Sequence, residues 1–283
     1  MTHQSLPAGL HPETLAVRQA QPRSHWGEHC EALFMTSSFV QPDCATAAAR
    51  FANPQEGFTY SRTGNPTVAS FEERLAAMEG TECAVATSTG MSAILLVALT
   101  ALKAGDHIVA SQSMFGSTMR LLGTEMARFG IESTFVPQTD AQAWAAAIRP
   151  NTKLLFAETP TNPLTDLCDI QALADIAHHH GALLVVDNSF ATPVLQRPVE
   201  FGADIVVHSG TKFLDGQGRI MIGAVCGTTA LVDKVMGTFL RSGGLNAAPY
   251  NAWTAMKGLE TLALRVKAQS ASALTLATWL QDH

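Results

Sequence analysis

The chain has 283 residues and a formal net charge of −6, and charged residues make up only 15% of its sequence. This length is enough for one large α/β domain, or for a domain and a half, with a sizeable core. The lysines and arginines are scattered rather than clustered, which argues against nucleic acid as a partner. Hydrophobic residues reach 47%, and with so few charges this favours a homo-oligomer.

The cysteines and the apolar runs indicate the compartment. The five cysteines are odd in number and include no Cys-x-x-Cys pair, so we expect reduced thiols in a cytoplasmic protein rather than disulfides or a zinc site. Residues 1–19 show no basic segment followed by an apolar core, and no apolar run approaches the length of a membrane helix. The sequence therefore predicts neither a signal peptide nor a membrane span.

The first part of the chain differs in character from the remainder. Residues 1–60 are rich in Pro, Gln, Ser and His and have no sustained hydrophobic period. They are predicted to form an N-terminal arm that needs another surface to fold upon. From residue 67, "TVASFEERLAAMEG" has apolar residues at helical spacing, and Gly80 stands where a helix C-cap would.

Short apolar runs then alternate with helical stretches through the middle of the chain. Continuous Val, Ile and Leu runs separated by helices are typical of a mostly parallel sheet covered on both faces. The fold class expected over residues 61–250 is therefore α/β. The six runs read as strands are "CAVATS", "HIVAS", "STFV", "KLLFAE", "ALLVVD" and "ADIVVHS".

The end of the sequence has a helical pattern. Residues 251–283 are predicted to form one long helix that leads toward a further domain absent from the chain. Its apolar face is expected to consist of Trp253, Met256, Leu259, Leu262 and Val266.

Three strand ends carry residues suited to one kind of ligand. The run "ALLVVD" ends in Asp187, and a buried acid there needs a positive partner. The run "ADIVVHS" leads into Ser209, Thr211 and Lys212, which places two hydroxyls near an amine able to attack a carbonyl. After "CAVATS", Gly90 opens a helix whose first N–H groups can hold a phosphate. A cofactor with a carbonyl, a phosphate and a protonated ring nitrogen satisfies all three, as pyridoxal phosphate does.

A collinear set of motifs resembles the cystathionine γ-synthase type of pyridoxal-phosphate enzymes. The resemblance covers most of the chain and implies fold type I, with a seven-stranded, mostly parallel sheet and a smaller C-terminal domain that we expect to be missing here. The motifs are "YSRTGNPT" (60–67), "TSTGMSAI" (87–94), "ETPTNPL" (158–164), "VVDNSFATP" (185–193), "HSGTKFLDGQGR" (208–219) and "LRSGG" with "NAW" and "KGLETLALR" (240–265).

The resemblance implies roles for individual residues. Lys212 would bind the cofactor aldehyde and later move the substrate protons, and Asp187 would pair with the ring nitrogen. Asn162 would lie near the cofactor's phenolic oxygen and the substrate carboxylate. The groups implied to hold the phosphate are the backbone N–H groups of Gly90 and Met91 and the hydroxyls of Ser209 and Thr211.

The resemblance also implies an assembly. Tyr60 and Arg62 of "YSR" would reach the phosphate of the neighbouring subunit's cofactor. This accounts for an N-terminal arm with no core of its own. A homotetramer built from two active dimers is expected.

Phe115 stands where many family members have a tyrosine stacked on the cofactor ring. It can stack but cannot donate or accept a proton. Together with "DGQGR" and "NAWTAMKGLETLALR", the stretch "SMFGST" is most similar to the O-succinylhomoserine sulfhydrylase branch. That branch replaces the γ-substituent of an activated homoserine with sulfide to give homocysteine, a step of methionine biosynthesis.

Several alternatives stay open at this point. Cystathionine γ-synthase activity or γ-elimination from methionine or cystathionine fits the same scaffold, and the acyl group on homoserine is not fixed. A truncated, non-catalytic chain that assembles with full-length subunits is an alternative of another class. The arginine that binds the substrate carboxylate in the family has no counterpart in this chain.

Other polar residues are interpreted as structural. Three consecutive histidines at 178–180 point in different directions on a helix, so no metal site is expected there. His208 is expected to hydrogen-bond at a strand end. Arg219 is expected to anchor either its own turn or a subunit contact, and Gly216 and Gly218 fit positive φ.

Overall fold

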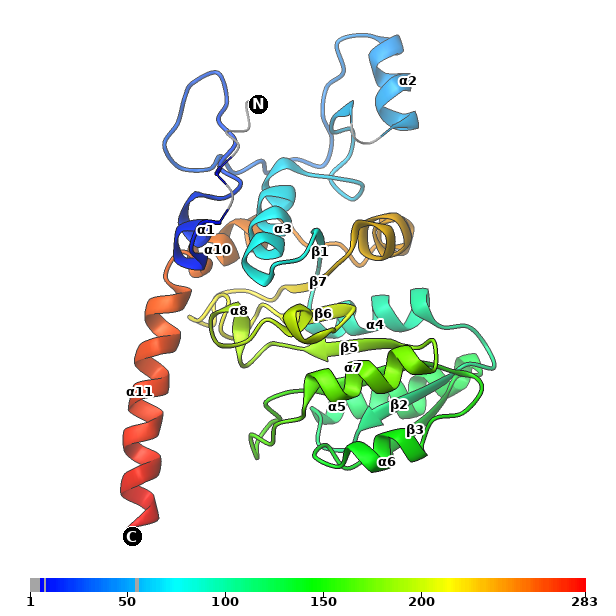
Figure 1. The fold of residues 1–283 in the computed structure, drawn as a ribbon. Coiled ribbons are helices and arrows are strands. Elements are labelled where there is room, and N and C mark those ends of the chain that lie inside the picture. The colour runs from blue at the N-terminus through cyan, green and yellow to red at the C-terminus, as the bar shows by residue number, and fades with distance from the viewer. Residues whose placement is uncertain (1–5, 8, 54–55) are drawn as a thin grey trace.

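A seven-stranded sheet forms the centre of the computed structural model, which describes residues 6–7, 9–53 and 56–283 (Figure 1). The strand order is β1-β7-β6-β5-β4-β2-β3. The strands are β1 (Cys83–Thr87), β2 (His107–Ser111), β3 (Glu132–Val136), β4 (Thr152–Glu158), β5 (Leu183–Asp187), β6 (Ile205–Ser209) and β7 (Gly223–Gly227).

Most neighbouring strands are parallel, which confirms the predicted fold class. The exception is β7, which is antiparallel to both β1 and β6. The six predicted runs all form strands, whereas β7 was not identified from the hydrophobic pattern. Because β6 and β7 are adjacent and antiparallel, the segment between them is a hairpin connection, and this connection carries Lys212.

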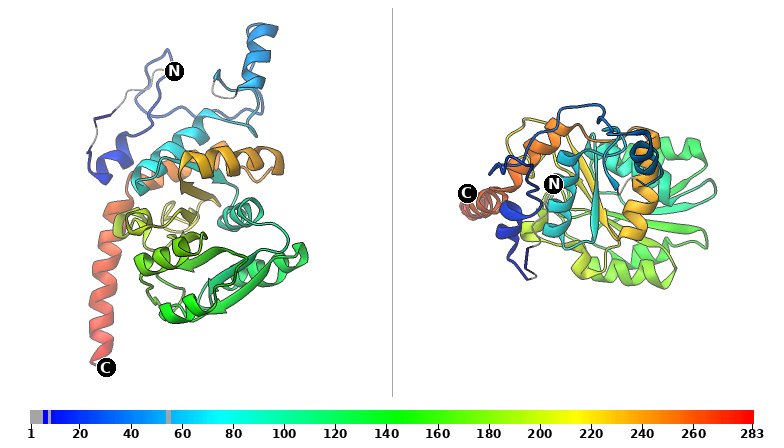
Figure 2. Two further views of the ribbon diagram at one scale, coloured as in Figure 1. Left: turned by 45° about the vertical axis from the view of Figure 1, so that its right-hand side comes forward. Right: turned by 90° about the horizontal axis from the view of Figure 1, so that it is seen from above.

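Helices cover both faces of the sheet (Figures 1 and 2). One face packs on α4 and α9, and the other packs on α3 and α10 at one end and on α6 and α7 at the other. The α-helices are α1 (Pro12–Arg18), α2 (Cys44–Ala52), α3 (Pro66–Glu79), α4 (Gly90–Ala101), α5 (Gly116–Arg120), α6 (Ala141–Ala146), α7 (Ile170–His179), α8 (Thr192–Leu195), α9 (Thr238–Gly243), α10 (Pro249–Leu259) and α11 (Leu262–Gln281). The remaining helical segments are η2 (Leu121–Glu125), η3 (Met126–Phe129), η4 (Pro198–Phe201) and η5 (Thr229–Gly237).

The limits of α3 follow from its sequence. Asn65 caps the helix by accepting a hydrogen bond from the Thr67 N–H, and Pro66 occupies the first turn, where its missing N–H costs nothing. Gly80 ends the helix with φ of 77°, a left-handed conformation that a glycine adopts without strain. The predicted helix and its C-cap are therefore confirmed.

The segment before α3 contains two short helices, α1 and α2. Ala16 of α1 is buried against the core shared with α3, whereas α2 has no buried residue. Figures 1 and 2 show α2 projecting away from the sheet. The division of the chain at residue 60 and the contact of this segment with a neighbouring subunit stay predictions.

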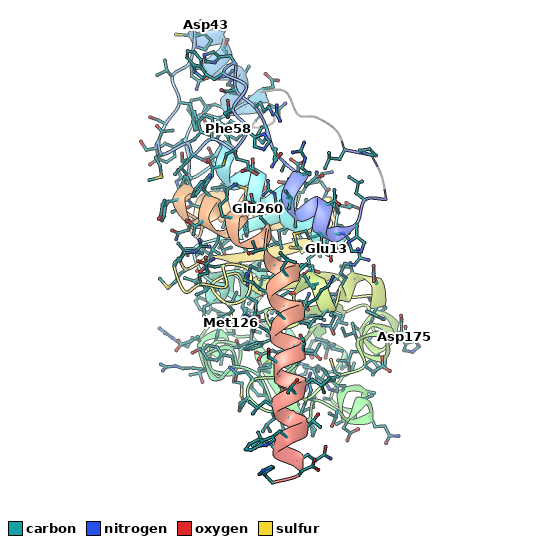
Figure 3. All side chains as sticks on the ribbon, turned by 90° about the vertical axis from the view of Figure 1, so that its left-hand side faces the viewer. Glu13, Asp43, Phe58, Met126, Asp175 and Glu260 are labelled. Atoms are coloured by element: carbon teal, nitrogen blue, oxygen red, sulfur yellow. The ribbon has the colours of Figure 1, made fainter. Side chains whose placement is uncertain are left out.

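The C-terminal region differs from the predicted single helix. Residues 251–283 lie in two helices, because α10 ends at Leu259 and α11 begins at Leu262. The predicted apolar face is nonetheless retained across the break, since four of its five members are buried and Trp253 packs against the same core. Beyond Val266 every residue of α11 is exposed, and the helix runs along the outside of the molecule (Figure 3). None of the described helices is long and apolar enough to cross a membrane.

Candidate active site

The carboxyl ends of β4, β5 and β6 bring three polar residues to one face of the sheet. Glu158 pairs in register with Asp187, and Ser209 ends the next strand. Each lies two positions after a core residue of the face that α4 covers, and residues two apart along a strand share a face. The site is therefore built on the α4 side of the sheet.

Asp187 lies at the centre of this edge, where partial burial disfavours the charged form of its carboxyl group. Burial raises the pKa of its carboxyl group, while hydrogen bonding by Ser189 and the charge of His208 act in the opposite direction. Its Oδ1 accepts a hydrogen bond from the Ser189 N–H at 3.0 Å. Within the part of the chain that the structure describes, Asp187 forms no ion pair, so a bound cation would be its natural partner.

The N-terminus of α4 lies directly against the end of β6. A Cβ atom on Gly90 would lie 2.6 Å from Ser209 Cβ and 2.9 Å from Ser209 Cα, closer than real Cβ atoms approach. Only glycine permits this approach. Thr89 caps the helix by accepting from the Ser92 N–H at 3.0 Å, while the N–H groups of Gly90 and Met91 belong to the first turn, where no intrahelical acceptor exists.

Lys212 lies in the turn that follows β6, with its side chain exposed. Its backbone N–H donates to Ser209 O at 3.1 Å, while its ammonium group makes no hydrogen bond or ion pair to a described residue. The Thr211 hydroxyl is oriented differently from the expectation, since it exchanges hydrogen bonds with the backbone of Ile222 at 3.1 and 3.3 Å. A hydroxyl can rotate, so phosphate binding by Thr211 stays a prediction.

The remainder of this loop is held by two arginines. Asp215 is fully buried and accepts from the backbone N–H and the Nε of Arg219, both at 2.8 Å. Arg219 therefore anchors its own turn, one of the two alternatives left open by the sequence. From α11, Arg265 donates to Phe213 O at 2.9 Å and to Leu214 O at 3.4 Å.

The glycines of the same loop adopt the predicted conformation. Gly216 has φ of 69° and Gly218 has φ of 66°. A Cβ on Gly216 would collide with the Arg265 guanidinium. The turn after Lys212 thus depends on glycine both for its backbone angle and for the approach of Arg265.

The backbone N–H groups of Phe115 and Asn162 both donate hydrogen bonds to the side chain of Glu158. The Phe115 N–H donates to Glu158 Oε2 at 2.9 Å, and the Asn162 N–H donates to Oε1 at 3.2 Å. Phe115 is half exposed at the start of α5, and Asn162 is exposed in the loop after β4. Both residues are therefore tied to the strand end beside Asp187.

Tyr60 and Arg62 belong to a different part of the structure. Both are exposed, and the Arg62 guanidinium lies 5.5 Å from the centre of the Tyr60 ring. Arg62 Nη1 donates to the backbone oxygen of Arg241 in α9, and Arg62 lines a cavity of about 470 Å³ together with Glu72. None of the hydrogen bonds found among the described residues joins Tyr60 or Arg62 to the Lys212 loop, and their role stays a prediction.

The remaining histidines and acids form structural contacts. His208 Nε2 lies 2.5 Å from Glu79 Oε1 in a pair with no exposed surface, as expected of a strand-end histidine. His178 pairs with Asp204 at 3.0 Å. Over residues 6–7, 9–53 and 56–283, no group of three or more His, Cys, Asp or Glu side chains is arranged to hold a metal ion.

The sequence did not single out two residues of this edge. Glu158 ends an apolar strand as Asp187 does, so the rule that identified Asp187 could have found it as well. Ser189 joins two parts of the site, since its N–H donates to Asp187 and its hydroxyl accepts from the Ser209 N–H at 2.6 Å. Nothing in its sequence context marks Ser189, because the contact depends on how β5 and β6 pair.

The donor groups fit pyridoxal phosphate on observations of the structure itself. The close approach at Gly90 leaves helix N–H groups beside a serine hydroxyl, which suits a phosphate. The partly buried carboxyl group of Asp187, whose pKa is raised, suits a protonated ring nitrogen, and the unpaired amine of Lys212 suits an aldehyde.

Comparisons with known proteins agree with this chemistry. A model of the Cys/Met metabolism PLP-dependent enzyme family matches residues 13–283. An O-succinylhomoserine sulfhydrylase of Pseudomonas aeruginosa strain PAO1 is 55% identical over 269 residues, which are 95% of this chain and 66% of that protein. A protein of the same name from Mycobacterium tuberculosis strain H37Rv is 42% identical over 282 residues, which are 100% of this chain and 70% of that protein.

A solved structure has the same fold. The crystal structure of cystathionine gamma-lyase from Lactobacillus plantarum complexed with L-serine superimposes with a TM-score of 0.90 at 34% identity, over 97% of this chain and 70% of that chain. The chain thus spans about two thirds of the length of the relatives it matches. It belongs to the Cys/Met metabolism PLP-dependent enzyme family, whose cofactor is pyridoxal phosphate.

Proposed function

We propose that the chain carries the cofactor site of an O-succinylhomoserine sulfhydrylase, which replaces the succinate on Cγ of the substrate with sulfide and releases homocysteine. The observation that carries the proposal is the 55% identity to the Pseudomonas aeruginosa protein of that name over 95% of the chain. The convergence of Gly90, Asp187 and the Lys212 loop on one sheet edge supports it.

Each residue of the site has a distinct task in this proposal. When bound, pyridoxal phosphate supplies an electron-withdrawing ring that stabilises negative charge on the substrate carbons. Asp187 keeps the proton on the ring nitrogen, because its partly buried carboxylate gains from a positive partner. The N–H groups at Gly90 and Met91, with the Ser209 hydroxyl, hold the phosphate.

Proton movement falls to Lys212. Phe115 has no ionisable group, so it can only stack and exclude water. The Lys212 amine is the base proposed to remove the proton from Cα and then from Cβ, so that succinate can leave Cγ. Once sulfide has added at Cγ, protons return to Cβ and Cα, which gives homocysteine. Asn162 would orient the substrate through its side-chain amide group.

The assembly belongs to the same proposal. Tyr60 and Arg62 would complete the site of a neighbouring subunit, so that two chains form an active dimer. Two such dimers make up the proposed homotetramer. Their exposure in the single chain supports this. The free cysteines fit a reducing cytoplasm.

Elimination is the second candidate activity, because the cystathionine gamma-lyase of Lactobacillus plantarum shares the fold at a TM-score of 0.90. Sulfide, cysteine and water can all complete the reaction after the γ-substituent leaves. The three outcomes give homocysteine, cystathionine and a keto acid with ammonia, so product analysis separates them.

The test begins with a visible spectrum of the purified chain mixed with pyridoxal phosphate. Borohydride reduction followed by peptide mapping should place the pyridoxyl group on Lys212, and Lys212→Ala should abolish the label. Lys153→Ala, at an exposed lysine on β4, is the matched control and should keep it. Product analysis with O-succinylhomoserine and sulfide is the next step.

The outcomes discriminate among the alternatives. Homocysteine formation would support the sulfhydrylase. A labelled chain that yields no product alone, and gains activity only on mixing with full-length subunits, would support the assembly partner. A colourless chain with no adduct would argue against the assignment of Lys212.

A further inference from the structure

The side chain of Glu158 holds two separate loops at the sheet edge. Its two carboxyl oxygens accept from different segments, Oε2 from the Phe115 N–H at 2.9 Å and Oε1 from the Asn162 N–H at 3.2 Å. Phe115 follows β2 and Asn162 follows β4, so the loops belong to neighbouring strands. The carboxyl group therefore fixes the distance between them.

The carboxyl group of Glu158 is buried, which disfavours its charged form. Glu158 is 3% exposed, and burial, reinforced by the charge of Asp187, raises its pKa to about 7. Among the described residues no cationic side chain forms an ion pair with the Glu158 carboxyl group. The nearby Gln138 amide donates to the Glu158 backbone oxygen and not to the carboxyl group. Its partners are thus two backbone N–H groups, each of which would be left without an acceptor if Glu158 were absent.

No other side chain of similar shape could replace it. A glutamine has one oxygen and one NH₂ group, so it could satisfy one N–H and would present a donor to the other. A carboxylate accepts at both oxygens. The geometry thus requires glutamate because two donors, rather than one, have to be met.

The position of Glu158 connects these loops with the proposed cofactor site. Glu158 and Asp187 are paired in register on adjacent parallel strands and face the same side of the sheet. Phe115 and Asn162 are the two residues proposed to contact the cofactor ring and the substrate. Glu158 therefore sets the positions of Phe115 and Asn162 relative to Asp187, its neighbour on the adjacent strand.

We propose that Glu158 is a positioning residue that holds Phe115 and Asn162 in fixed places beside Asp187. The proposal rests on the proposed function only for the identity of the ligand, because the contacts of Glu158 belong to the chain itself. Glu158 moves no proton in the reaction and need not touch the substrate.

The test compares amide hydrogen exchange in the wild-type chain, Glu158→Gln and Glu158→Asp, without added ligand and at a pH above 7, where the Glu158 side chain is a carboxylate because its pKa is about 7. In the wild type the amides of Phe115 and Asn162 should exchange slowly. In Glu158→Gln at least one of the two should exchange roughly tenfold or more faster, the value expected for losing a hydrogen bond to a charged acceptor. Glu132→Gln, at an exposed glutamate on β3, is the matched control and should leave both unchanged.

Binding of pyridoxal phosphate gives the second readout. Glu158→Gln should keep the Lys212 adduct, while the visible circular dichroism of the bound cofactor weakens, because the ring loses its fixed neighbours. If the wild type fails to bind the cofactor, the proposed function fails, yet the exchange experiment still decides the role of Glu158.

Every outcome of the exchange experiment decides the proposal. Unchanged exchange at both amides in Glu158→Gln, or fast exchange at both in the wild type, would overturn it. An equal acceleration throughout α4 would show a general loss of stability and would overturn the specific role. If Glu158→Gln does not fold, Glu158→Asp decides, since its shorter side chain should accelerate the same two amides while α4 stays protected.

Discussion

Glu72 in α3 illustrates how burial of one carboxyl group makes stability depend on pH. Its Oε1 accepts from the Ala86 N–H at 2.7 Å. Burial raises its pKa to about 7, and Asp233 acts in the same direction. Because the folded chain holds this proton more tightly than the unfolded chain, the unfolding free energy falls as pH rises from about 4.5 to about 7.

Glu72→Gln should remove this loss, since the amide oxygen can still accept from Ala86 without carrying a charge. We expect the variant to be about as stable as the wild type at about pH 4, below both pKa values, and more stable at about pH 8 by up to about 3 kcal/mol. Urea unfolding at the two pH values measures the difference. Glu73→Gln, at the next and exposed position, should keep the wild-type dependence, and equal slopes for all three proteins would contradict the argument.

The cost of burying a carboxyl group also explains which site residues the sequence could predict. An acid at the end of an apolar strand marked Asp187, and the same pattern marks Glu158. The sequence pattern could have identified Glu158 but not its two partners, because backbone N–H groups such as those of Phe115 and Asn162 occur at nearly every residue. The contact of Gly90 with Ser209 was equally invisible, because it depends on the packing of α4 on β6.

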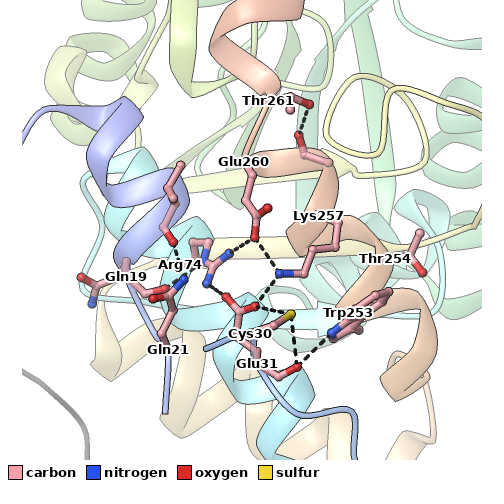
Figure 4. Close-up of polar contacts among 12 residues, drawn as sticks. Gln19, Gln21, Cys30, Glu31, Arg74, Trp253, Thr254, Lys257, Glu260 and Thr261 are labelled. Carbon is pink, nitrogen blue, oxygen red and sulfur yellow. Dashed lines mark hydrogen bonds and ion pairs between the residues drawn. The ribbon is translucent and has the colours of Figure 1, made fainter. Parts of the chain in front are cut away.

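Among the elements, α3 and α10 are joined to the N-terminal segment by a buried cluster of charges (Figure 4). Arg74 has no exposed surface and pairs with Glu31, which also accepts from Lys257 at 2.5 Å. Arg74 Nε donates to Gln19 O at 2.8 Å, and Lys257 contacts Glu260 at 2.7 Å. Although burial acts to raise it, Arg74 and Lys257 lower the pKa of Glu31 to about 2.

Glu31→Ala should be strongly destabilising, because it leaves the buried Arg74 without its main counter-charge. The expected loss is about 3–5 kcal/mol, measured as the shift of the urea midpoint at constant slope. Glu132→Ala removes an exposed partner of Arg149 and should cost about 1 kcal/mol or less. Equal losses for the two variants would show that burial does not set the strength of these pairs.

At the level of elements, the hydrophobic pattern predicted the parallel strands and missed the exceptions. The run "GAVCG" of β7 begins and ends with a glycine, and it comes after the lysine loop rather than after a helix. The break between α10 and α11 was missed because Leu259 and Leu262 continue the helical period across it. Neither exception carries a proline, so only the packing reveals them.

The whole molecule combines a packed body with a helix that leaves it. Residues 267–283 are exposed throughout, and α11 runs down the outside of the molecule (Figure 3). Three leucines and Trp279 are exposed to solvent along this part of the helix. A helix without tertiary contacts is marginal, because most helical stability in proteins comes from packing.

Amide exchange along α11 should therefore be uneven. The amides after Lys267 are expected to exchange far faster than those near Val266, which is buried. Mass spectrometry of proteolytic fragments measures this in the isolated chain. Uniform protection along the helix would mean that another surface covers it, and light scattering would then reveal whether that surface is a second copy.

Arg265 joins the first turn of α11 to the loop that carries Lys212. The helix has 20 residues and a length of about 30 Å, and its first turn is bonded to the carbonyl groups of Phe213 and Leu214. The position of the first turn of α11 and the course of the backbone beside Lys212 are therefore coupled through the Arg265 side chain.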